Sequence, residues 1–357
     1  MVAQRQQEWR ERIEARPIEL IDRRREALLA DAKAAVGAFV GAQPENFGFV
    51  TNATGGVNAV LQSLELDAGD ELLTVNHVYN AVRQAMRHVA QRAGAAVIEV
   101  PIPLPVHSPQ QLIDAIGANL SERTRLVVID HVTSPTALVF PIQQIIDRCA
   151  TRGIDVLVDG AHAPGMVDLD IESLGAAYYS ANLHKWACAP MGTAMLWVRP
   201  DRQAAIHPTT VSHYYGEGMA AEFSWQGTRD MSGWLAAPTA IEYFEQYGWQ
   251  RVREHNHQMA MWVQRMLCDR WNSLGVQPTT PLDGSMIGSM TTLRLPDRMR
   301  EIFASPADLH DRLYDAFSIE VPIFDWDDAW WIRASCQIYN TPDDYERLAD
   351  AVLKILA

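Results

Sequence analysis

The sequence has only four cysteines in 357 residues, and no two of them form a Cys-x-x-Cys pair. Such a scattered set supports neither a zinc site nor a disulfide framework, so we expect free thiols, no bound metal and a reducing, cytoplasmic environment. The chain also has no apolar run long enough to span a membrane. Its charged N-terminus lacks the apolar segment of a secretory signal, so neither membrane insertion nor secretion is expected.

The sequence has fewer basic than acidic residues. The 30 lysines and arginines face 44 acidic residues, which leaves a formal net charge of −14. An acidic chain of this kind is a poor partner for nucleic acid or for an anionic membrane surface. The sequence contains neither a Walker A motif nor a complete Gly-x-Gly-x-x-Gly, so nucleotide binding has no local support. The hydrophobic fraction of 48% is that of a globular protein, and the length predicts more than one domain.

Periodicity predicts the elements of the first two thirds of the chain. The first forty residues are predicted as helix, interrupted near Pro17, and a strand-like FGFV follows at 47–50. Five apolar runs are predicted as buried strands, at 71–75, 95–100, 125–130, 155–159 and 194–198. Amphipathic segments lie between them. This alternation predicts an α/β fold whose mostly parallel sheet is covered by helices on both faces.

The pattern changes at about residue 238. A long helix is predicted from Pro238 through roughly Leu274, DWDDAWW (325–331) is predicted as a loop entering a strand, and a last helix begins near Thr341. Further strand-like runs lie at 289–296, 319–324 and 330–336. The predicted domains are an N-terminal helical arm, a large domain and a small α+β domain, at 1–30, 31–237 and 238–357.

Three segments carry residues that suit chemistry. In TNATGGVNAV, Gly55 and Gly56 let the chain turn tightly into a helix whose first N–H groups can bind a phosphate, although a plain glycine turn explains the segment equally well. In VLVDGAHAPG, Asp159 ends a buried strand, and ligands of open α/β sheets bind at such strand ends. Asp159 can pair with a cationic ring nitrogen or a metal, or cap the next helix, and His162 can reach the same ligand.

The third segment, SANLHKWACAPMG, places Lys185 in a nearly uncharged window. A lysine in an apolar pocket loses its proton more readily, becomes a nucleophile and forms a Schiff base with an aldehyde. A phosphate cradle, a strand-end aspartate and such a lysine together predict one cofactor, pyridoxal 5′-phosphate.

With these motifs the sequence resembles a known family, the class V aminotransferase superfamily of fold-type-I pyridoxal-phosphate enzymes. Within it, the chain is most similar to the isopenicillin N epimerase-like and cysteine desulfurase-like branch, from about Arg10 to the C-terminus. The resemblance implies a mostly parallel seven-stranded sheet flanked by helices, with a smaller C-terminal α+β domain. It also implies a homodimer with sites shared between subunits. Seven motifs carry it in order: NATGGVNAV, NHVYNAVRQ, HVTSPTAL, VDGAHAPG, NLHKW, FSWQGTRD and IRASCQIYNTPDD.

The resemblance implies catalytic and cofactor-binding roles, carried over position by position. Lys185 would form the Schiff base and carry the Cα proton. Asp159 would keep the ring nitrogen protonated. His162 would contact the 3-oxygen of the ring, with Ser134 or Thr136 nearby.

Phosphate and substrate contacts are implied in the same way. Tyr214, like its neighbours His213 and Tyr215, is a candidate for a second acid or a substrate contact, with plain loop packing as the alternative. The resemblance implies that the phosphate is bound by Thr54, Gly55, Asn182 and His184, and by Thr228 of the other subunit. It also implies that Tyr79 stacks on the ring face and that Arg333 binds the substrate carboxylate.

The reaction is left open by the resemblance. Cysteine desulfurases carry a nucleophilic cysteine shortly before the carboxylate-binding arginine, but residues 317–331 contain none and Cys336 follows Arg333. We therefore expect an epimerase or racemase that acts on an amino acid through an external aldimine and Cα deprotonation by Lys185. The alternatives are a β-eliminating C–S lyase similar to hercynylcysteine sulfoxide lyase, and a class V aminotransferase. A non-catalytic cofactor-binding protein is a further alternative, because the chain starts without the Asn-His-Gly-Ser-like segment of its relatives.

Overall fold

The computed structural model describes residues 1–281 and 283–356. The chain forms two compact units. The first comprises Met1–Pro101, Leu112–Val132 and Pro141–Trp249, and the second comprises Ile102–Gln111, Thr133–Phe140 and Gln250–Ala357. The domain ranges 1–30, 31–237 and 238–357 stay a prediction. Within residues 1–281 and 283–356, none of the helices combines the length and the apolar character needed to cross a membrane.

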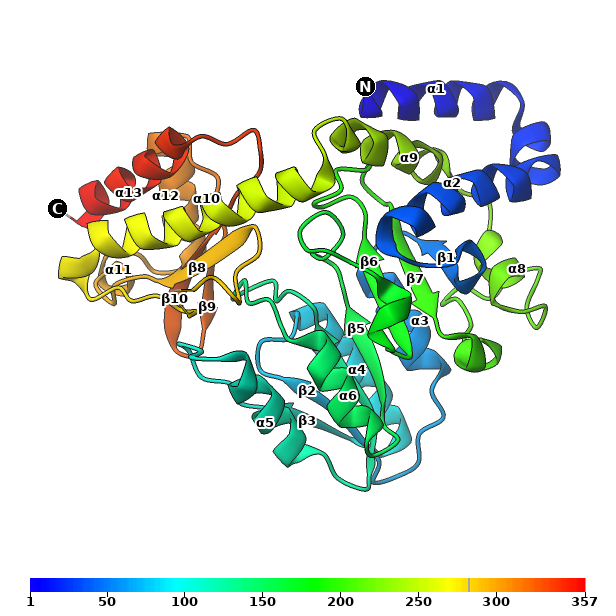
Figure 1. Ribbon diagram of the computed structural model, residues 1–357, viewed down its shortest axis with the longest axis horizontal. Helices are drawn as coiled ribbons and strands as arrows, with labels where there is room; N and C mark the ends of the chain where they lie inside the picture. The colour runs from blue at the N-terminus through cyan, green and yellow to red at the C-terminus, as the bar shows by residue number, and fades with distance from the viewer. Residues whose placement is uncertain (282, 357) are drawn as a thin grey trace. The chain divides into compact units, whose positions relative to one another are not determined.

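The N-terminal helices belong to the first unit. The chain starts with α1 (Val2–Ala15), a short π-helix η1 (Ile18–Arg23) and α2 (Arg25–Val40), so the helical prediction with its break near Pro17 is confirmed. Both α1 and α2 pack against α9 (Ser232–Glu245), which Figure 1 shows in green beside the blue N-terminal helices.

A seven-stranded sheet forms the centre of the first unit. Its order is β1-β7-β6-β5-β4-β2-β3, and β7 alone runs antiparallel to its neighbours. The sheet predicted from the sequence is therefore confirmed, and so are its strands, except that β6 was missed because YYSAN lacks an aliphatic run. The strands are β1 (Phe47–Val50), β2 (Glu71–Val75), β3 (Ala96–Val100), β4 (Thr124–Asp130), β5 (Asp155–Asp159), β6 (Tyr178–Asn182) and β7 (Ala194–Val198).

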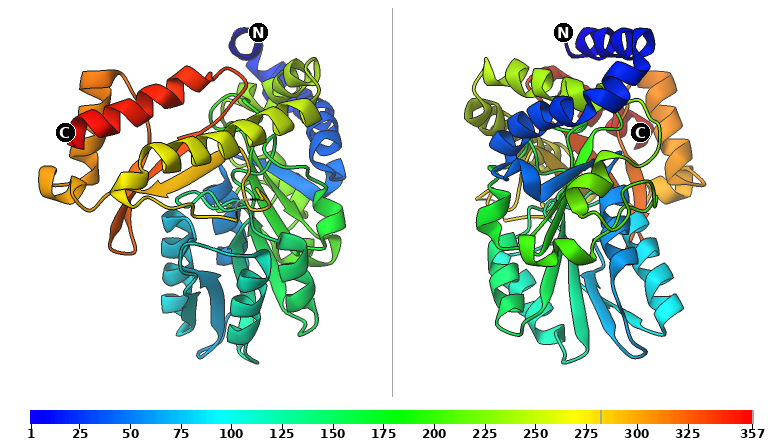
Figure 2. Two further views of the ribbon diagram at one scale, coloured as in Figure 1. Left: turned by 60° about the vertical axis from the view of Figure 1, so that its left-hand side comes forward. Right: turned by 90° about the vertical axis from the view of Figure 1, so that its right-hand side faces the viewer.

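Helices cover both faces of this sheet. On one face α3 and α4 pack side by side, and α4 buries an apolar stripe at helical spacing that includes Val82, Met86 and Val89. Figure 2 shows α6 on the opposite face, where it packs against β5. The helices of this region are η2 (Pro44–Asn46), α3 (Ala53–Ser63), α4 (Asn80–Ala93), α5 (Pro109–Asn119), α6 (Ile142–Ala150), α7 (Ile171–Leu174), η3 (Pro200–Ala205) and α8 (Met219–Ser224).

The second unit is a small α+β layer. A three-stranded antiparallel sheet of order β8-β10-β9 packs its apolar side chains, such as Leu293 and Ile332, with those of α10, α12 and α13. Its elements are α10 (Trp249–Arg270), η4 (Asn272–Leu274), β8 (Met290–Arg294), α11 (Met299–Ile302), α12 (Pro306–Phe317), β9 (Ile323–Trp326), β10 (Ala329–Ser335) and α13 (Pro342–Leu356).

Two predictions in this part of the chain are wrong. The long helix expected from Pro238 is broken, because Gly248 adopts a φ of 78° between α9 and α10, and Pro238 itself lies inside α9. The segment 325–331 is a hairpin rather than a loop entering a strand. Asp327 and Asp328 form its two-residue turn with φ values of 51° and 57°, which favour the right-handed twist of the paired strands.

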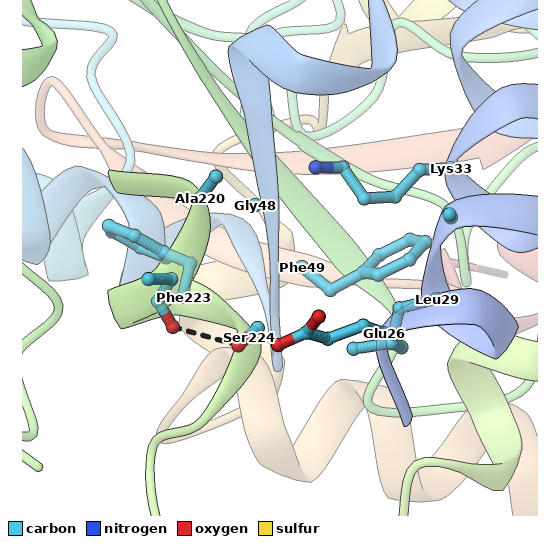
Figure 3. A pocket seen from close by; sticks show the side chains of 10 residues that line it. Glu26, Leu29, Lys33, Gly48, Phe49, Ala220, Phe223 and Ser224 are labelled. Carbon is cyan, nitrogen blue, oxygen red and sulfur yellow. Dashed lines mark hydrogen bonds between the residues drawn. The ribbon is translucent and has the colours of Figure 1, made fainter. Parts of the chain in front are cut away.

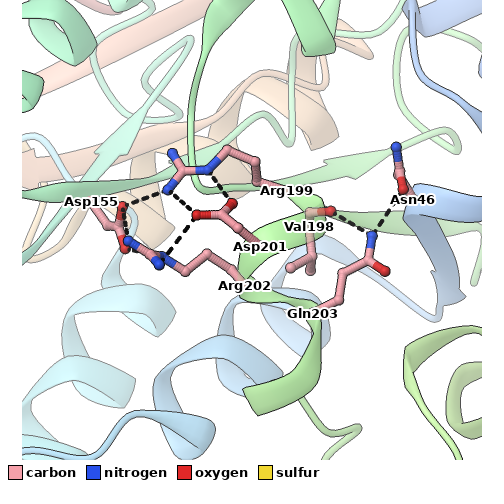
Figure 4. Close-up of polar contacts among 7 residues, drawn as sticks. All are labelled: Asn46, Asp155, Val198, Arg199, Asp201, Arg202 and Gln203. Carbon is pink, nitrogen blue, oxygen red and sulfur yellow. Dashed lines mark hydrogen bonds and ion pairs between the residues drawn. The ribbon is translucent and has the colours of Figure 1, made fainter.

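A cluster of ion pairs lies at the amino end of β5 (Figure 4). Asp155, the first residue of this strand, accepts hydrogen bonds from Arg199 at 3.1 Å and Arg202 at 2.6 Å. Asp201 pairs with the same two arginines. These groups are partly exposed, so each pair contributes little to stability, and the chemistry has to be sought at the other end of the strand.

Candidate active site

Three buried polar side chains stand in a row at the carboxyl ends of β4, β5 and β6. Asp130 is in register with Asp159, and Asp159 is in register with Ser180. Their exposed fractions are 2%, 3% and 0%. Because side chains at one register position of a parallel sheet point to the same face, these three lie side by side. Asp159 thus lies where open α/β sheets bind ligands.

The strand β6 holds the first turn of α3. The side chain of Asn182 accepts a hydrogen bond from the Ala53 N–H at 2.7 Å, and the Ser180 hydroxyl donates to the Ala53 carbonyl at 2.9 Å. The N-cap residue Asn52 accepts from the Gly55 N–H at 2.8 Å. A Cβ at Gly56 would lie 2.2 Å from the Ser180 Oγ, so only glycine lets helix and strand approach this closely.

The same first turn has an open side that suits a phosphate. The Thr54 N–H makes no hydrogen bond among the described residues, whereas the N–H groups of Ala53, Gly55 and Gly56 are all paired. A Cβ at Gly55 would meet only the side chains of Asn52 and Thr51, both 3.6 Å away. A phosphate could therefore approach Thr54 and Gly55 at a helix N-terminus, as predicted from the sequence.

Lys185 lies three residues beyond β6 and contacts His162. Its Nζ is 2.9 Å from the His162 Nε2, and the indole N–H of Trp186 donates to the His162 Nδ1 at 3.1 Å. His162 and Trp186 are buried, with exposed fractions of 5% and 8%. The structure thus brings together two of the predicted catalytic residues, and it adds Trp186, which the sequence reasoning missed.

This hydrogen-bond pattern determines the protonation of Lys185. An indole N–H can only donate, so the Nδ1 of His162 must accept, and the proton of the neutral imidazole is on Nε2. An ammonium group could not accept from that Nε2–H. The 2.9 Å contact therefore requires Lys185 as a neutral amine, the nucleophilic form.

His184 is half-buried between the loop and β7. Its Nδ1 is 2.8 Å from the Thr193 carbonyl and therefore carries a proton, which leaves Nε2 as an acceptor in the neutral ring. Burial lowers the pKa of His184, and the hydrogen bond to the Thr193 carbonyl offsets part of this effect. A phosphate contact through Nε2 would need the protonated ring, so the phosphate itself would have to supply the favourable charge.

Tyr79 and His131 lie on the loops after β2 and β4. Tyr79 precedes α4 with a side chain that is 44% exposed, so its predicted stacking role stays a prediction. His131 is buried, and its Nδ1 is 2.7 Å from the hydroxyl of Tyr179. Burial lowers the pKa of His131 to about 4, so it is neutral at pH 7. The sequence assigns no role to His131, because a lone histidine in a polar turn carries no signal of its own.

Arg333 lies on β10 in the second unit, beside Ser134. Its Nη1 donates to the carbonyl and, at 3.2 Å, to the hydroxyl of Ser134. Its Nε is buried and has no partner among the residues that the structure describes. Burial lowers the pKa of this guanidinium. An unpaired Nε beside a fork of donors suits a carboxylate, as expected for a substrate-binding arginine. Thr136 lies on the same loop as Ser134, 2.8 Å from the Thr133 hydroxyl.

The remaining predicted residues, Thr228 and Tyr214, belong to a long segment before α9. Thr228 is exposed and makes no hydrogen bond among the described residues, although its neighbour Asp230 pairs with Arg10 of α1 at 2.9 Å. The hydroxyl of Tyr214 accepts from Arg25 at 3.2 Å, and Arg25 also lies against the Tyr214 ring. The roles of Thr228 and Tyr214 therefore stay predictions.

The two buried thiols, Cys149 and Cys336, do not supply a nucleophile. Cys336 is fully buried, and burial raises its pKa to about 12. Burial likewise raises the pKa of Cys149 to about 11. A thiol held in this way stays protonated and inert at neutral pH, which agrees with the expectation that Cys336 carries no persulfide.

A separate pocket of about 330 Å³ lies on the first unit, between α2, β1 and α8 (Figure 3). Its apolar lining includes Leu29, Phe49 and Phe223, and Lys33 extends along it. No predicted site residue lines this pocket, so it is not part of the candidate active site.

Comparison with solved structures agrees with the fold. A cystine C–S lyase, solved with its reaction product cysteine persulfide, superposes with a TM-score of 0.82 over 98% of this chain and 93% of that one, at 20% sequence identity. A lysine-to-alanine variant of a protein that is also named C-DES superposes with a TM-score of 0.80, and it contains glycine covalently linked to pyridoxal phosphate. At these identities the likeness shows the fold.

Comparison with protein sequences shows the family. The isopenicillin N epimerase of Amycolatopsis lactamdurans is 35% identical over 364 residues, covering 97% of this chain and 89% of that protein. A probable chloroplastic L-cysteine desulfhydrase of Arabidopsis thaliana is 32% identical, covering 97% of this chain and 78% of that protein. A family model described as aminotransferase class-V matches residues 11–284. The chain therefore belongs to the aminotransferase class-V family, whose members are enzymes that use pyridoxal phosphate.

Proposed function

We propose that this chain binds pyridoxal phosphate and catalyses a reaction that begins at the Cα of an amino-acid substrate. The observation that carries the proposal is the contact of Lys185 with His162, which holds the lysine as a neutral amine on the loop after β6. The buried carboxyl of Asp159, at the end of the neighbouring strand, supports it.

The donor set suits the parts of this cofactor. The first turn of α3, with Thr54 and Gly55, would bind the phosphate, and Asp159 would pair with the ring nitrogen. Lys185 would bind the aldehyde, and the Nε2–H of His162 would be released to donate to the 3-oxygen. When bound, pyridoxal phosphate acts as an electron sink that makes the Cα proton of an attached amino acid acidic.

The charge state of Asp159 matters for this role. Burial raises its pKa, whereas the hydrogen bond from the Ala161 N–H favours the carboxylate. A protonated ring nitrogen would add a positive charge beside Asp159 and keep it ionised.

Proton transfer at Cα would fall to Lys185. A neutral Nζ can accept the Cα proton directly, and His162 keeps it oriented while Trp186 fixes the imidazole. Arg333 would hold the substrate carboxylate through its unpaired Nε.

We propose epimerisation or racemisation as the reaction. The support is the 35% identity to an isopenicillin N epimerase over 97% of the chain. Inversion at Cα also needs an acid on the opposite side, for which Tyr214 is the candidate. Its hydroxyl is engaged by Arg25 in this structure.

The second candidate is a β-eliminating C–S lyase, which needs only one base at Cα. The engagement of Tyr214 by Arg25 favours it, since Lys185 is then the one base identified. Relatives named L-cysteine desulfhydrase at 34% and 32% identity add support.

Proton NMR of the enzyme with pyridoxal phosphate in D2O separates the two reactions, using amino acids and S-substituted cysteines as substrates. Deuterium at Cα together with the D-isomer is expected for the epimerase. Pyruvate without inversion would establish the lyase instead. If no substrate exchanges its Cα proton and Lys185→Ala behaves as wild type, both reactions are excluded.

A further inference from the structure

A second buried aspartate lies next to Asp159. Asp130, the last residue of β4, is in register with Asp159 on β5, and the exposed fractions of the two residues are 2% and 3%. Two carboxylates this close in a dry interior cannot both ionise at neutral pH, so one of the pair keeps a proton. The reaction described above has no step for Asp130.

The contacts of the two residues decide which one keeps the proton. Asp159 accepts a hydrogen bond from the Ala161 N–H at 2.9 Å, and the protonated ring nitrogen of the bound cofactor would be its counter-charge. Among residues 1–281 and 283–356, the Asp130 side chain accepts a hydrogen bond from the backbone N–H of Tyr79, and its other oxygen, Oδ1, is buried without a partner. A negative charge is therefore better stabilised on Asp159.

The charges around Asp130 agree with this assignment. Burial and the charge of Asp159 raise the pKa of Asp130 well above its usual range, while the Tyr79 N–H and Arg83 of α4 lower it less. On the other side of β4, the buried His77 lies on the loop after β2.

We propose that Asp130 stays protonated and acts as a positioning residue that leaves the negative charge of the pair on Asp159. Its carbonyl oxygen also anchors the Tyr79 N–H at the start of α4. The inference rests on the proposed function only in that Asp159 is taken to face the ring nitrogen of the cofactor.

The test uses two variants of similar size. Asp130→Asn is neutral like the protonated acid and keeps an acceptor for the Tyr79 N–H. Asp130→Leu is also neutral but has no acceptor. We expect Asp130→Asn to bind pyridoxal phosphate as the wild type does. Asp130→Leu is expected to bind it about fivefold more weakly, the loss typical of one hydrogen bond.

Infrared spectroscopy of the holoenzyme with isotope-labelled aspartate gives a direct readout. The C=O stretch of a protonated carboxyl is expected in the wild type at pH 7 and absent from Asp130→Asn. Asp155→Asn is the control, because Asp155 is ion-paired with Arg199 and Arg202 and contributes no such band. A band missing from the wild type, or retained in Asp130→Asn, overturns the proposal.

Urea unfolding of the holoenzyme across pH provides a second readout. Below about pH 4 the Asp130 carboxyl is protonated in both the folded and the unfolded state. As pH rises, the unfolded state ionises while the folded state does not. The unfolding equilibrium constant of the wild type should therefore rise tenfold per pH unit relative to Asp130→Asn, until the folded carboxyl also ionises. If the unfolding equilibrium constants of the wild type and of Asp130→Asn change in parallel from pH 4 upward, the folded Asp130 does not retain its proton.

The two proposals fail in different ways. If Asp159→Asn leaves the absorption spectrum of the bound cofactor unchanged, the role given to Asp159 is wrong, whatever the infrared band shows. If that spectrum changes but the wild type has no protonated-carboxyl band, only the inference about Asp130 is wrong.

Discussion

At the scale of single residues, the candidate site depends on which atom carries each proton. Trp186 donates to the Nδ1 of His162, and this one bond places the imidazole proton on the nitrogen that faces Lys185. An indole, which never ionises, thereby holds a lysine in its reactive form. The contact between His162 and Lys185 could not by itself fix the position of the proton, because each of these side chains can either donate or accept a hydrogen bond.

Trp186→Phe should slow the attachment of pyridoxal phosphate to the apoenzyme. Without the indole donor, His162 can place its proton on Nδ1 and accept from a charged Lys185, which is not nucleophilic. We expect a five- to tenfold lower rate, about the effect of one buried hydrogen bond, measured by the absorbance of the bound cofactor. The matched control is Trp197→Phe, because the buried Trp197 Nε1 makes no hydrogen bond within the described part of the chain. Equal rates for both variants would remove the role assigned to Trp186.

At the scale of elements, the start of α3 illustrates how two adjacent glycines serve different purposes. Gly56 is packed against Ser180 of β6, where a Cβ would lie 2.2 Å from the hydroxyl oxygen. Gly55 faces an open side, where the nearest atoms would be 3.6 Å from a Cβ. One glycine is needed for packing, and the other leaves room for a ligand.

Gly56→Ala and Gly55→Ala should therefore have opposite signatures. Gly56→Ala is expected to destabilise the fold by about 1–3 kcal/mol through overpacking, and Ser180→Ala in the same chain should recover part of that loss. Gly55→Ala should leave the free energy of unfolding nearly unchanged and weaken pyridoxal phosphate binding. Urea unfolding and cofactor titration of the variants check both. A Gly55→Ala variant that is as unstable as Gly56→Ala would contradict this division.

The elements also show how far the sequence alone could lead. Aliphatic runs predicted the five strands correctly, and Asp159 and Lys185 were found from the strand end and the uncharged window around them. The strand YYSAN was missed because packing against its neighbours, rather than its own composition, makes it a strand. The pairing of Asp130 with Asp159 depends on strand order and register, which no local pattern contains.

At the scale of the whole molecule, one predicted residue is not explained by the single chain. Thr228 is exposed, lies on a loop tied to α1 through Asp230 and Arg10, and makes no hydrogen bond among the described residues. A homodimer in which Thr228 contacts the phosphate bound in the other subunit, as the family resemblance implies, would give this side chain a partner.

Co-expression of Lys185→Ala with Thr228→Asp tests this arrangement. Each variant alone is expected to be nearly inactive, the second because a carboxylate would repel the phosphate. A heterodimer with shared sites carries both lesions in one site and none in the other, so activity should return. Native mass spectrometry verifies that heterodimers form. Heterodimers without activity would show that Thr228 does not act across the interface.

The second unit is assembled from three stretches of chain, and this has a consequence for biosynthesis. Residues 102–111 and 133–140 are translated early, yet their hydrogen-bond partners include Thr279, Met286 and Arg333. Arg333 is made 199 residues after Ser134. At roughly 5–20 residues per second, the loop that carries Ser134 and Thr136 waits about 10–40 seconds on the ribosome for its partner. The contacts of this loop with β10 are therefore completed last, after every strand of the seven-stranded sheet has been translated.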